Sequence, residues 1–118
     1  MKKNLQGIVM EEILRALSKS LRAFELGESE IKIYSLLQRE ALTPRQIAKT
    51  LGLSERIVRE KLKHLLELGL VERTLVNRGW LGYVYYAKAP KEALQVLFNK
   101  LESTLKVIEK EGEAKLKG

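Results

Sequence analysis

Three basic side chains in the middle of the sequence share one side of a predicted helix: Arg56, Arg59 and Lys63. At about 100° per residue, they fall within roughly 60° of one another. The opposite arc, which we expect to face the core, is apolar and consists of Val58, Leu62, Leu65 and Leu66. Guanidinium groups donate hydrogen bonds to guanine O6 and N7, and arginine and lysine also bind phosphate. The pattern predicts a helix over about 54–68 that buries one face and turns donors toward the major groove of duplex DNA.

Three further residues are candidates for contacts with the DNA backbone. Arg45 and Ser54 lie near the predicted starts of two helices, where backbone N–H groups attract phosphate. Ser54 is also expected to cap its helix. Arg78 lies in a predicted turn between two strands, from which a long cation reaches phosphate or the minor groove.

Other side chains near this basic face have competing interpretations. Glu60 either accepts a hydrogen bond from cytosine N4 or pairs with a neighbouring cation, and we favour the salt bridge. Trp80 is expected to pack at the base of the hairpin rather than stack on a nucleobase. His64, at the edge of the exposed arc, is expected at the surface or beside phosphate. For the basic face as a whole, the alternative is an ordinary solvated helix surface.

The distribution of charge supports a nucleic-acid surface. The 118 residues contain 22 basic and 15 acidic side chains, for a net charge of +7 and a pI near 9.7. Residues 43–88 contain nine basic and four acidic residues, so this middle segment alone holds +5. A basic segment between nearly neutral flanks is typical of nucleic-acid-binding domains.

The residue types that are missing argue against catalysis and metal binding. The sequence has no Cys and one His, and all fifteen acidic residues are Glu. A thiolate zinc site, a Ser-His-Asp triad and an EF-hand loop therefore have no ligands or catalytic groups within one chain. We expect a protein that is not an enzyme and that has no metal site and no cofactor.

The elements that must position the basic residues follow from periodicity and capping signals. Thr43, Pro44 and Gln46 form a capping box with proline at the first helical position, and Gly52 breaks that helix. We predict helices over about 3–23, 28–39, 44–51, 54–68 and 91–111. A hairpin, or wing, is predicted over about 70–87, with a turn at 77–79. The fold class is mainly α with a β-hairpin: a winged helix-turn-helix with N- and C-terminal dimerisation helices.

We expect a single winged-helix domain over 1–118. Its parts are an N-terminal helix at 1–23, the winged helix-turn-helix core at 24–88 and a C-terminal helix at 90–112.

The core segment resembles the DNA-binding domain of the TrmB-like family of archaeal transcriptional regulators. The resemblance covers roughly 24–90. It is carried by Phe24, Leu26, Glu30, Lys32-Ile33-Tyr34, Leu36-Leu37, the run from Leu42 to Ala48, the Leu-Gly-Leu-Ser of 51–54, Gly69 to Glu72, and the exit near Tyr86 and Pro90. It implies a role in transcription regulation. Many family members have a large C-terminal sugar-binding domain. Because this sequence ends at 118, we expect a stand-alone winged helix without sugar sensing.

The terminal helices are candidates for dimerisation. Apolar residues recur at nearly a/d spacing in the last helix, at Leu94, Leu97, Leu101, Leu105 and Ile108. Leu5 and Ile8 are candidates on the first helix. A two-fold homodimer would present two recognition helices about 34 Å apart, or a multiple of that distance, to a palindromic site. Packing of the last helix against the first helix of the same chain is the alternative, and both arrangements are compatible.

The remaining expectations concern location and partners. No run of 18 apolar residues exists, and the segment after the first lysines is polar, so we expect no membrane span, no secretory signal and a cytoplasmic location. Double-stranded DNA is the expected partner. A protein-interaction module of the transcription machinery with little DNA affinity is the second hypothesis. The sequence indicates no operator, target gene or direction of control, and whether a small-molecule effector exists stays open.

Overall fold

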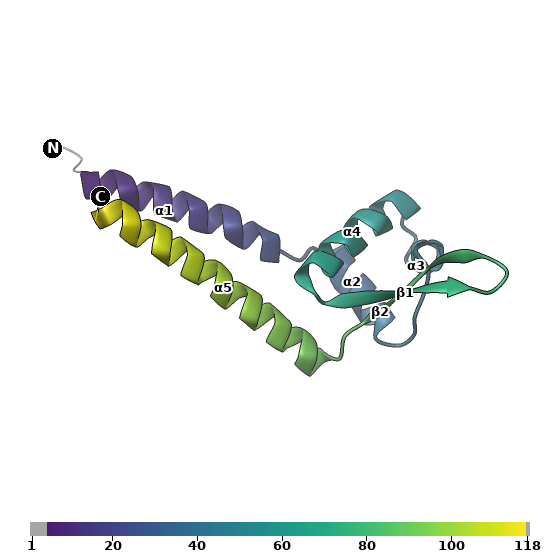
Figure 1. Ribbon diagram of the computed structural model, residues 1–118. Coiled ribbons are helices and arrows are strands. Elements are labelled where there is room, and N and C mark those ends of the chain that lie inside the picture. The colour runs from purple at the N-terminus through teal and green to yellow at the C-terminus, as the bar shows by residue number, and fades with distance from the viewer. Residues whose placement is uncertain (1–4, 118) are drawn as a thin grey trace. The chain divides into compact units, whose positions relative to one another are not determined.

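The computed structural model describes the backbone of residues 5–117 and the side chains of residues 9–114. Its elements, in chain order, are α1 (Leu5–Leu21), the 3-10 turn η1 (Arg22–Phe24), α2 (Glu28–Leu37), α3 (Pro44–Leu51), α4 (Glu55–Leu68), β1 (Val71–Asn77), β2 (Leu81–Ala87) and α5 (Pro90–Lys117) (Figure 1). The described residues are mostly helical, with one antiparallel hairpin. This confirms the predicted fold class.

The described backbone divides into two compact units. The winged unit, residues 26–97, contains α2, α3, α4, the hairpin and the first turns of α5. The helical unit contains α1, η1 and the rest of α5. The expectation of a single domain stays a prediction.

Local signals set the ends of α3 and α4. The hydroxyl oxygen of Thr43 accepts a hydrogen bond from the backbone N–H of Gln46 at 3.2 Å, and the Gln46 side chain accepts from the N–H of Thr43 at 2.9 Å. The predicted capping box is therefore confirmed. Gly52 ends α3 at φ +69°, and Ser54 caps α4 by accepting from the N–H of Ile57. Because Gly52 adopts the left-handed conformation, the chain turns sharply between the two helices.

The core of the winged unit is apolar and joins all of its helices to the base of the wing. Its fully buried side chains include Ile33 of α2, Ile47 of α3, Val58, Leu62 and Leu65 of α4, and Val71 of β1. The predicted core face of α4 is thus largely confirmed. Leu66 is only half-buried, whereas Leu68 is buried, since the core side of α4 is centred on Val58 and Leu65 and extends toward Leu68.

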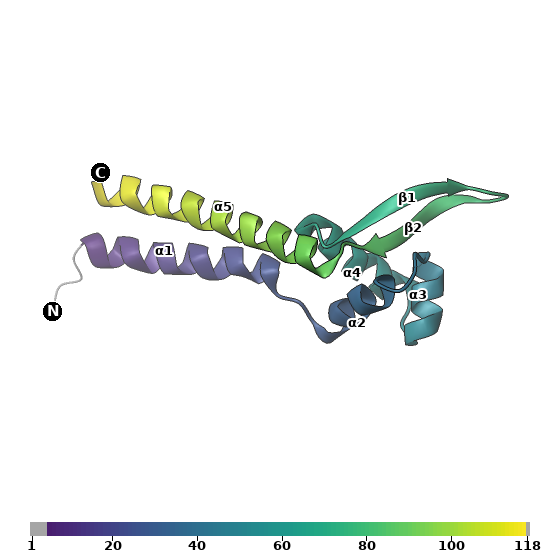
Figure 2. The same ribbon diagram turned by 90° about the horizontal axis from the view of Figure 1, so that it is seen from below.

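Two backbone hydrogen bonds, which no sequence pattern predicts, connect the hairpin to the rest of the winged unit. β1 and β2 pair from Val71 with Ala87 to Asn77 with Leu81, and Gly79 turns between them at φ +79°. Leu42, just before α3, donates to the carbonyl of Tyr85 at 3.0 Å and accepts from its N–H at 2.8 Å. The base of the wing is held beside α3, and the rest of the hairpin extends beyond it (Figure 2).

In the helical unit, α1 lies beside the C-terminal part of α5. Val9 and Ile108 are buried there. We expected the last helix to end near residue 112, but α5 continues to Lys117. Gly112 does not end it, because it lies against α1: a Cβ atom at this position would stand 2.8 Å from Cδ1 of Ile13. The glycine here permits close helix packing rather than a C-cap.

Candidate nucleic-acid interface

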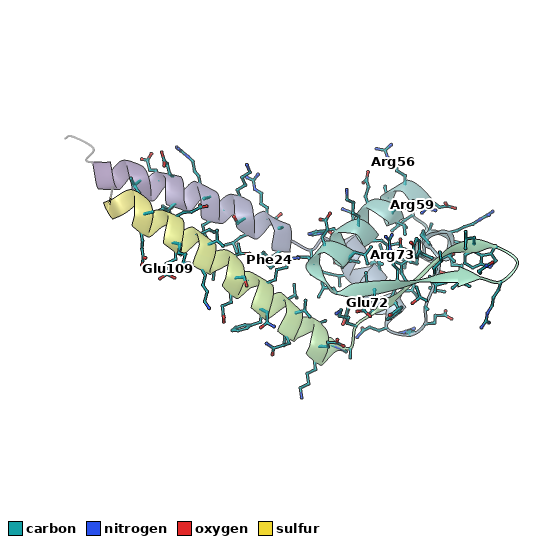
Figure 3. The ribbon with its side chains drawn as sticks, in the orientation of Figure 1. Phe24, Arg56, Arg59, Glu72, Arg73 and Glu109 are labelled. Atoms are coloured by element: carbon teal, nitrogen blue, oxygen red, sulfur yellow. The ribbon has the colours of Figure 1, made fainter. Side chains whose placement is uncertain are left out.

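The structure places the three basic residues of α4 on its exposed side. Arg56 and Arg59 extend outward from the helix, with side chains that are 88% and 62% exposed (Figure 3). Lys63 is exposed about one turn beyond Arg59. Val58, Leu62 and Leu65 lie buried on the other side of the same helix. The division of α4 into a buried face and a cationic face follows directly from its helical period.

Each arginine near this face pairs loosely with a glutamate. Arg56 lies 3.7 Å from Glu60, and this contact supports the salt-bridge interpretation of Glu60. Glu55 holds two arginines at once: one carboxylate oxygen lies 4.0 Å from Nε of Arg45 and the other lies 3.7 Å from Nη2 of Arg59. Exposed pairs of this kind contribute little stability. The arginines are therefore able to exchange a glutamate for a phosphate at small cost.

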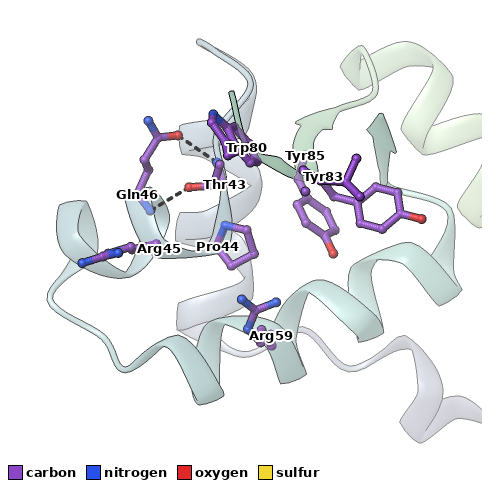
Figure 4. A pocket seen from close by; sticks show the side chains of 10 residues that line it. Thr43, Pro44, Arg45, Gln46, Arg59, Trp80, Tyr83 and Tyr85 are labelled. Atoms are coloured by element: carbon purple, nitrogen blue, oxygen red, sulfur yellow. Dashed lines mark hydrogen bonds between the residues drawn. The ribbon is translucent and has the colours of Figure 1, made fainter. Parts of the chain in front are cut away.

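A cleft of about 650 Å³ lies between the start of α3, the middle of α4 and the start of β2 (Figure 4). Arg45 lines it from α3, Arg59 from α4, and Trp80 and Tyr83 from the wing. The structure thus brings together two predicted DNA-binding residues that are 14 positions apart in the chain. It adds two aromatic residues, Tyr83 and Trp80, of which Trp80 was expected to pack at the base of the hairpin.

Trp80 was expected at the base of the wing. It lies instead just before β2, next to the turn. It is 46% exposed, and its ring lies over Gly82: a Cβ atom on Gly82 would stand 2.6 Å from the ring atom Cζ3. The position next to the turn keeps the ring away from the buried core. The available signal was Gly82 itself, because a glycine inside a strand marks a close approach of another group.

The second aromatic residue of the cleft is held by a cation. The guanidinium carbon of Arg73 lies 4.2 Å from the centre of the Tyr83 ring, within cation–π range. A hydrogen bond with Tyr85, the cross-strand neighbour of Arg73, raises the pKa of the guanidinium further above its ordinary value. Arg73 therefore stays charged, and it adds a positive group beside the aromatic wall.

The other candidate DNA contacts lie apart from the cleft. Ser54 is used as the cap of α4. Arg78 lies in the exposed turn of the wing, where its backbone N–H donates to the carbonyl of Trp80 at 3.1 Å.

His64 is half-buried and turns toward α2. Its Nδ1 contacts a carboxylate oxygen of Glu30. Glu30 is only 4% exposed, and it also accepts from the N–H of Gly27 and lies 3.9 Å from Nζ of Lys61. A buried carboxylate requires such partners, and His64 is one of them because α2 and α4 pack together.

The candidate dimerisation residues divide by exposure. Leu94 and Leu105 are exposed, and Leu97 and Leu101 are half-buried. Ile108 is buried within the helical unit, where it lines a small cavity with Ile13 and Ala16 of α1; this favours packing within one chain for that residue. Leu5 and Ile8 belong to α1, but their side chains lie outside the described part of the structure.

Among the described residues, no three His, Cys, Asp or Glu side chains stand close enough together to hold a metal ion. No helix in the described part of the chain has both the length and the apolar character needed to span a bilayer.

The comparison with known sequences gives a family match and one curated relative. Residues 21–92 match the family described as "Sugar-specific transcriptional regulator TrmB". The HTH-type transcriptional regulator LysM of the archaeon Sulfurisphaera tokodaii is 35% identical over 54 residues, which are 45% of this chain and 39% of that protein. The matched segment thus spans well under half the length of this curated relative.

Solved structures show the same fold at low sequence identity. A possible transcriptional regulator from Methanosarcina mazei superposes with a TM-score of 0.61 at 15% identity, covering 89% of this chain and 87% of that one. A protein from the thermoacidophilic archaeon Sulfolobus tokodaii gives 0.53 at 22% identity, with coverage of 83% and 95%. The Multiple Antibiotic Resistance Repressor, MarR, gives 0.50 at 17% identity, with coverage of 92% and 75%. With the family match over more than half of its length, the chain belongs to the TrmB family of winged-helix transcriptional regulators.

Proposed function

We propose that the protein regulates transcription by binding double-stranded DNA sequence-specifically as a homodimer. In this proposal α4 enters the major groove with Arg56, Arg59 and Lys63 toward the base edges. Arg45 and Ser54 contact phosphates, and Arg78 acts from the wing on the backbone or the minor groove. The observation that carries the proposal is α4 itself: long cationic side chains, paired with Glu55 and Glu60, extend from its exposed side, while its other side is buried in the core. A recognition helix requires this division.

Unpartnered apolar side chains of the helical unit support the homodimer. Met10 and Leu14 of α1 are 50% and 52% exposed, and Phe98 of α5 is 60% exposed. Large apolar side chains at helical spacing on a surface are typical of subunit interfaces. Closed two-fold dimers are also the commonest assembly, and they match palindromic DNA sites.

The test is a titration of a labelled duplex from the protein's own promoter, followed by fluorescence anisotropy at several salt concentrations. We expect Arg59→Ala and Lys63→Ala to weaken binding, and each lost phosphate contact to lower the slope of log affinity against log salt by about 0.9. Lys106→Ala, on α5, is the matched control and should leave both quantities unchanged. If wild type and all variants bind every duplex alike, the assignment of the α4 face is wrong.

A second candidate function is a protein-interaction module of the transcription machinery. The observation that favours it is the exposure of apolar side chains on the wing: Leu75 is 54% exposed and Leu81 is 70% exposed. It predicts little affinity for duplex DNA and a partner whose binding is insensitive to salt. Pull-down of proteins of the transcription machinery with this protein as bait, compared with the DNA titration, separates the two functions. A cytoplasmic location follows from either proposal.

A further inference from the structure

The cleft between α3, α4 and the wing combines cationic and aromatic surface. Arg45 and Arg59 are among its lining residues, while Trp80 and Tyr83 supply aromatic surface (Figure 4). Arg73, on the Tyr83 ring, adds a third cation close by, against the one carboxylate of Glu55. A ligand that fits must therefore carry negative charge and apolar surface within a few ångströms of each other. The sugar–phosphate backbone of DNA alternates these two features along its length.

Both aromatic rings of the cleft, those of Trp80 and Tyr83, pack against a specific neighbour and keep exposed surface. The Trp80 ring occupies the space beside Gly82 into which the side chain of any other residue at position 82 would extend. Nearly half of the Trp80 surface is nevertheless open to solvent. Tyr83 is 41% exposed and is held by Arg73. Each ring thus has a close neighbour on one side and free surface for a ligand, and a side chain that is already confined loses less entropy on binding.

We propose that this cleft holds the sugar–phosphate backbone of one DNA strand, with a phosphate at Arg45 and a deoxyribose against the Trp80 ring, while Arg59 extends from the cleft toward the base edges. The inference rests on the proposed DNA-binding function and adds Trp80 as a contact residue that reads no base. Charge complementarity identifies the occupant, because guanidinium groups bind phosphate oxygens in bidentate fashion. Glu55 keeps the two arginines side by side until the strand arrives.

The first test uses Trp80, the single tryptophan of the chain, as its own reporter. At saturating promoter duplex, acrylamide quenching of its fluorescence should fall in the wild-type protein. An unchanged quenching constant in a protein that has bound the duplex, as judged by anisotropy, overturns the inference. Absence of any duplex binding instead defeats the proposed function itself. The two failures are therefore distinguishable.

The second test separates apolar from ionic contacts by their response to salt. Trp80→Ala should weaken binding about tenfold, and equally for promoter and scrambled duplexes, while the salt slope stays unchanged because no counterion is released. Arg45→Gln should instead lower that slope by about 0.9. Trp80→Phe keeps an aromatic wall and should recover most of the affinity.

Gly82→Ala provides an independent route to the same result. The added methyl group would collide with the Trp80 ring and displace it, so this variant should bind as weakly as Trp80→Ala. Thr74→Ala, at an exposed position of β1, is the control and should bind like wild type. Thermal unfolding of each variant verifies that the fold is kept. Wild-type affinity in both Trp80→Ala and Gly82→Ala would contradict the proposal and favour a wing that docks a protein.

Discussion

At the scale of single residues, Glu55 is the acidic group that pairs with two arginines of the candidate interface. Its two oxygens pair with arginines from two different helices, at 4.0 Å and 3.7 Å. On a surface that binds DNA, a carboxylate repels phosphate and lowers affinity for any sequence. It also pairs with both Arg45 and Arg59, so in the proposed complex we expect the loss of affinity to be larger for duplexes that do not match. Glu55 is therefore expected to favour specificity over affinity.

Glu55→Gln is expected to raise affinity for a scrambled duplex about two- to fivefold, because one like-charge repulsion is removed. Affinity for the promoter should rise less, so the ratio of specific to non-specific binding should fall. Competition titrations at fixed salt measure this ratio. Glu102→Gln, which affects an exposed pair with Lys106 on α5, is the control. A ratio that stays constant in Glu55→Gln would refute the role in specificity.

At the scale of elements, two glycines in the left-handed conformation end α3 and α4, but they have different surroundings. A Cβ atom on Gly52 would meet nothing within 4 Å, so the strain there is confined to the backbone. A Cβ atom on Gly69 would stand 2.7 Å from Cγ1 of Val96, at the start of α5. Gly69 thus both ends α4 and allows the first turns of α5 to pack against that end.

Gly52→Ala is expected to lower the free energy of unfolding by about 1 kcal/mol through backbone strain. Gly69→Ala should lower it further, by about 2 kcal/mol or more, because steric overlap adds to strain. Urea denaturation measures both values. Adding Val96→Ala to Gly69→Ala should recover the stability lost to steric overlap. It should not recover the stability lost to backbone strain. If the two single variants are equally stable, the close contact with Val96 is not significant.

The sequence predicts the elements well because their signals are local. The Thr43–Gln46 capping box, the break at Gly52 and the cap at Ser54 each depend on neighbours within four residues. The site is predicted only in part. The cationic face of α4 follows from helical period, but the position of Trp80 and the turn of His64 toward Glu30 depend on how distant segments pack. The pair formed by His64 and Glu30 joins residues 34 positions apart, and no periodic pattern reports such a contact.

At the scale of the whole molecule, the proposed homodimer would set the strength of DNA binding. In that proposal one α4 reaches a single half-site, whereas two linked copies bind both half-sites with a high effective concentration. The exposed apolar residues of the helical unit are the candidates for this link, and Phe98 is the largest of them on α5.

Phe98→Glu is expected to convert a dimer into monomers and to weaken promoter binding by about 10²-fold or more, since the gain from linked half-sites is lost. Analytical ultracentrifugation gives the assembly state, and anisotropy gives the affinity. Ser103→Glu places the same charge at an exposed polar position of α5 and should change neither. A Phe98→Glu protein that remains dimeric would exclude Phe98 from the interface.

The double hydrogen bond between Leu42 and Tyr85 has a consequence for the order of folding. It closes a loop that contains α3, α4 and β1, and closing a long loop costs chain entropy before any contact compensates for it. α3 and α4, neighbours in the chain, are expected to pair early, and the wing is expected to dock last. In the native state the same pair should be among the first to open, so amide hydrogens at Leu42 and Tyr85 should exchange before those of Leu62 and Leu65. The winged unit would then pass through a state in which α4 is formed and the wing is still detached.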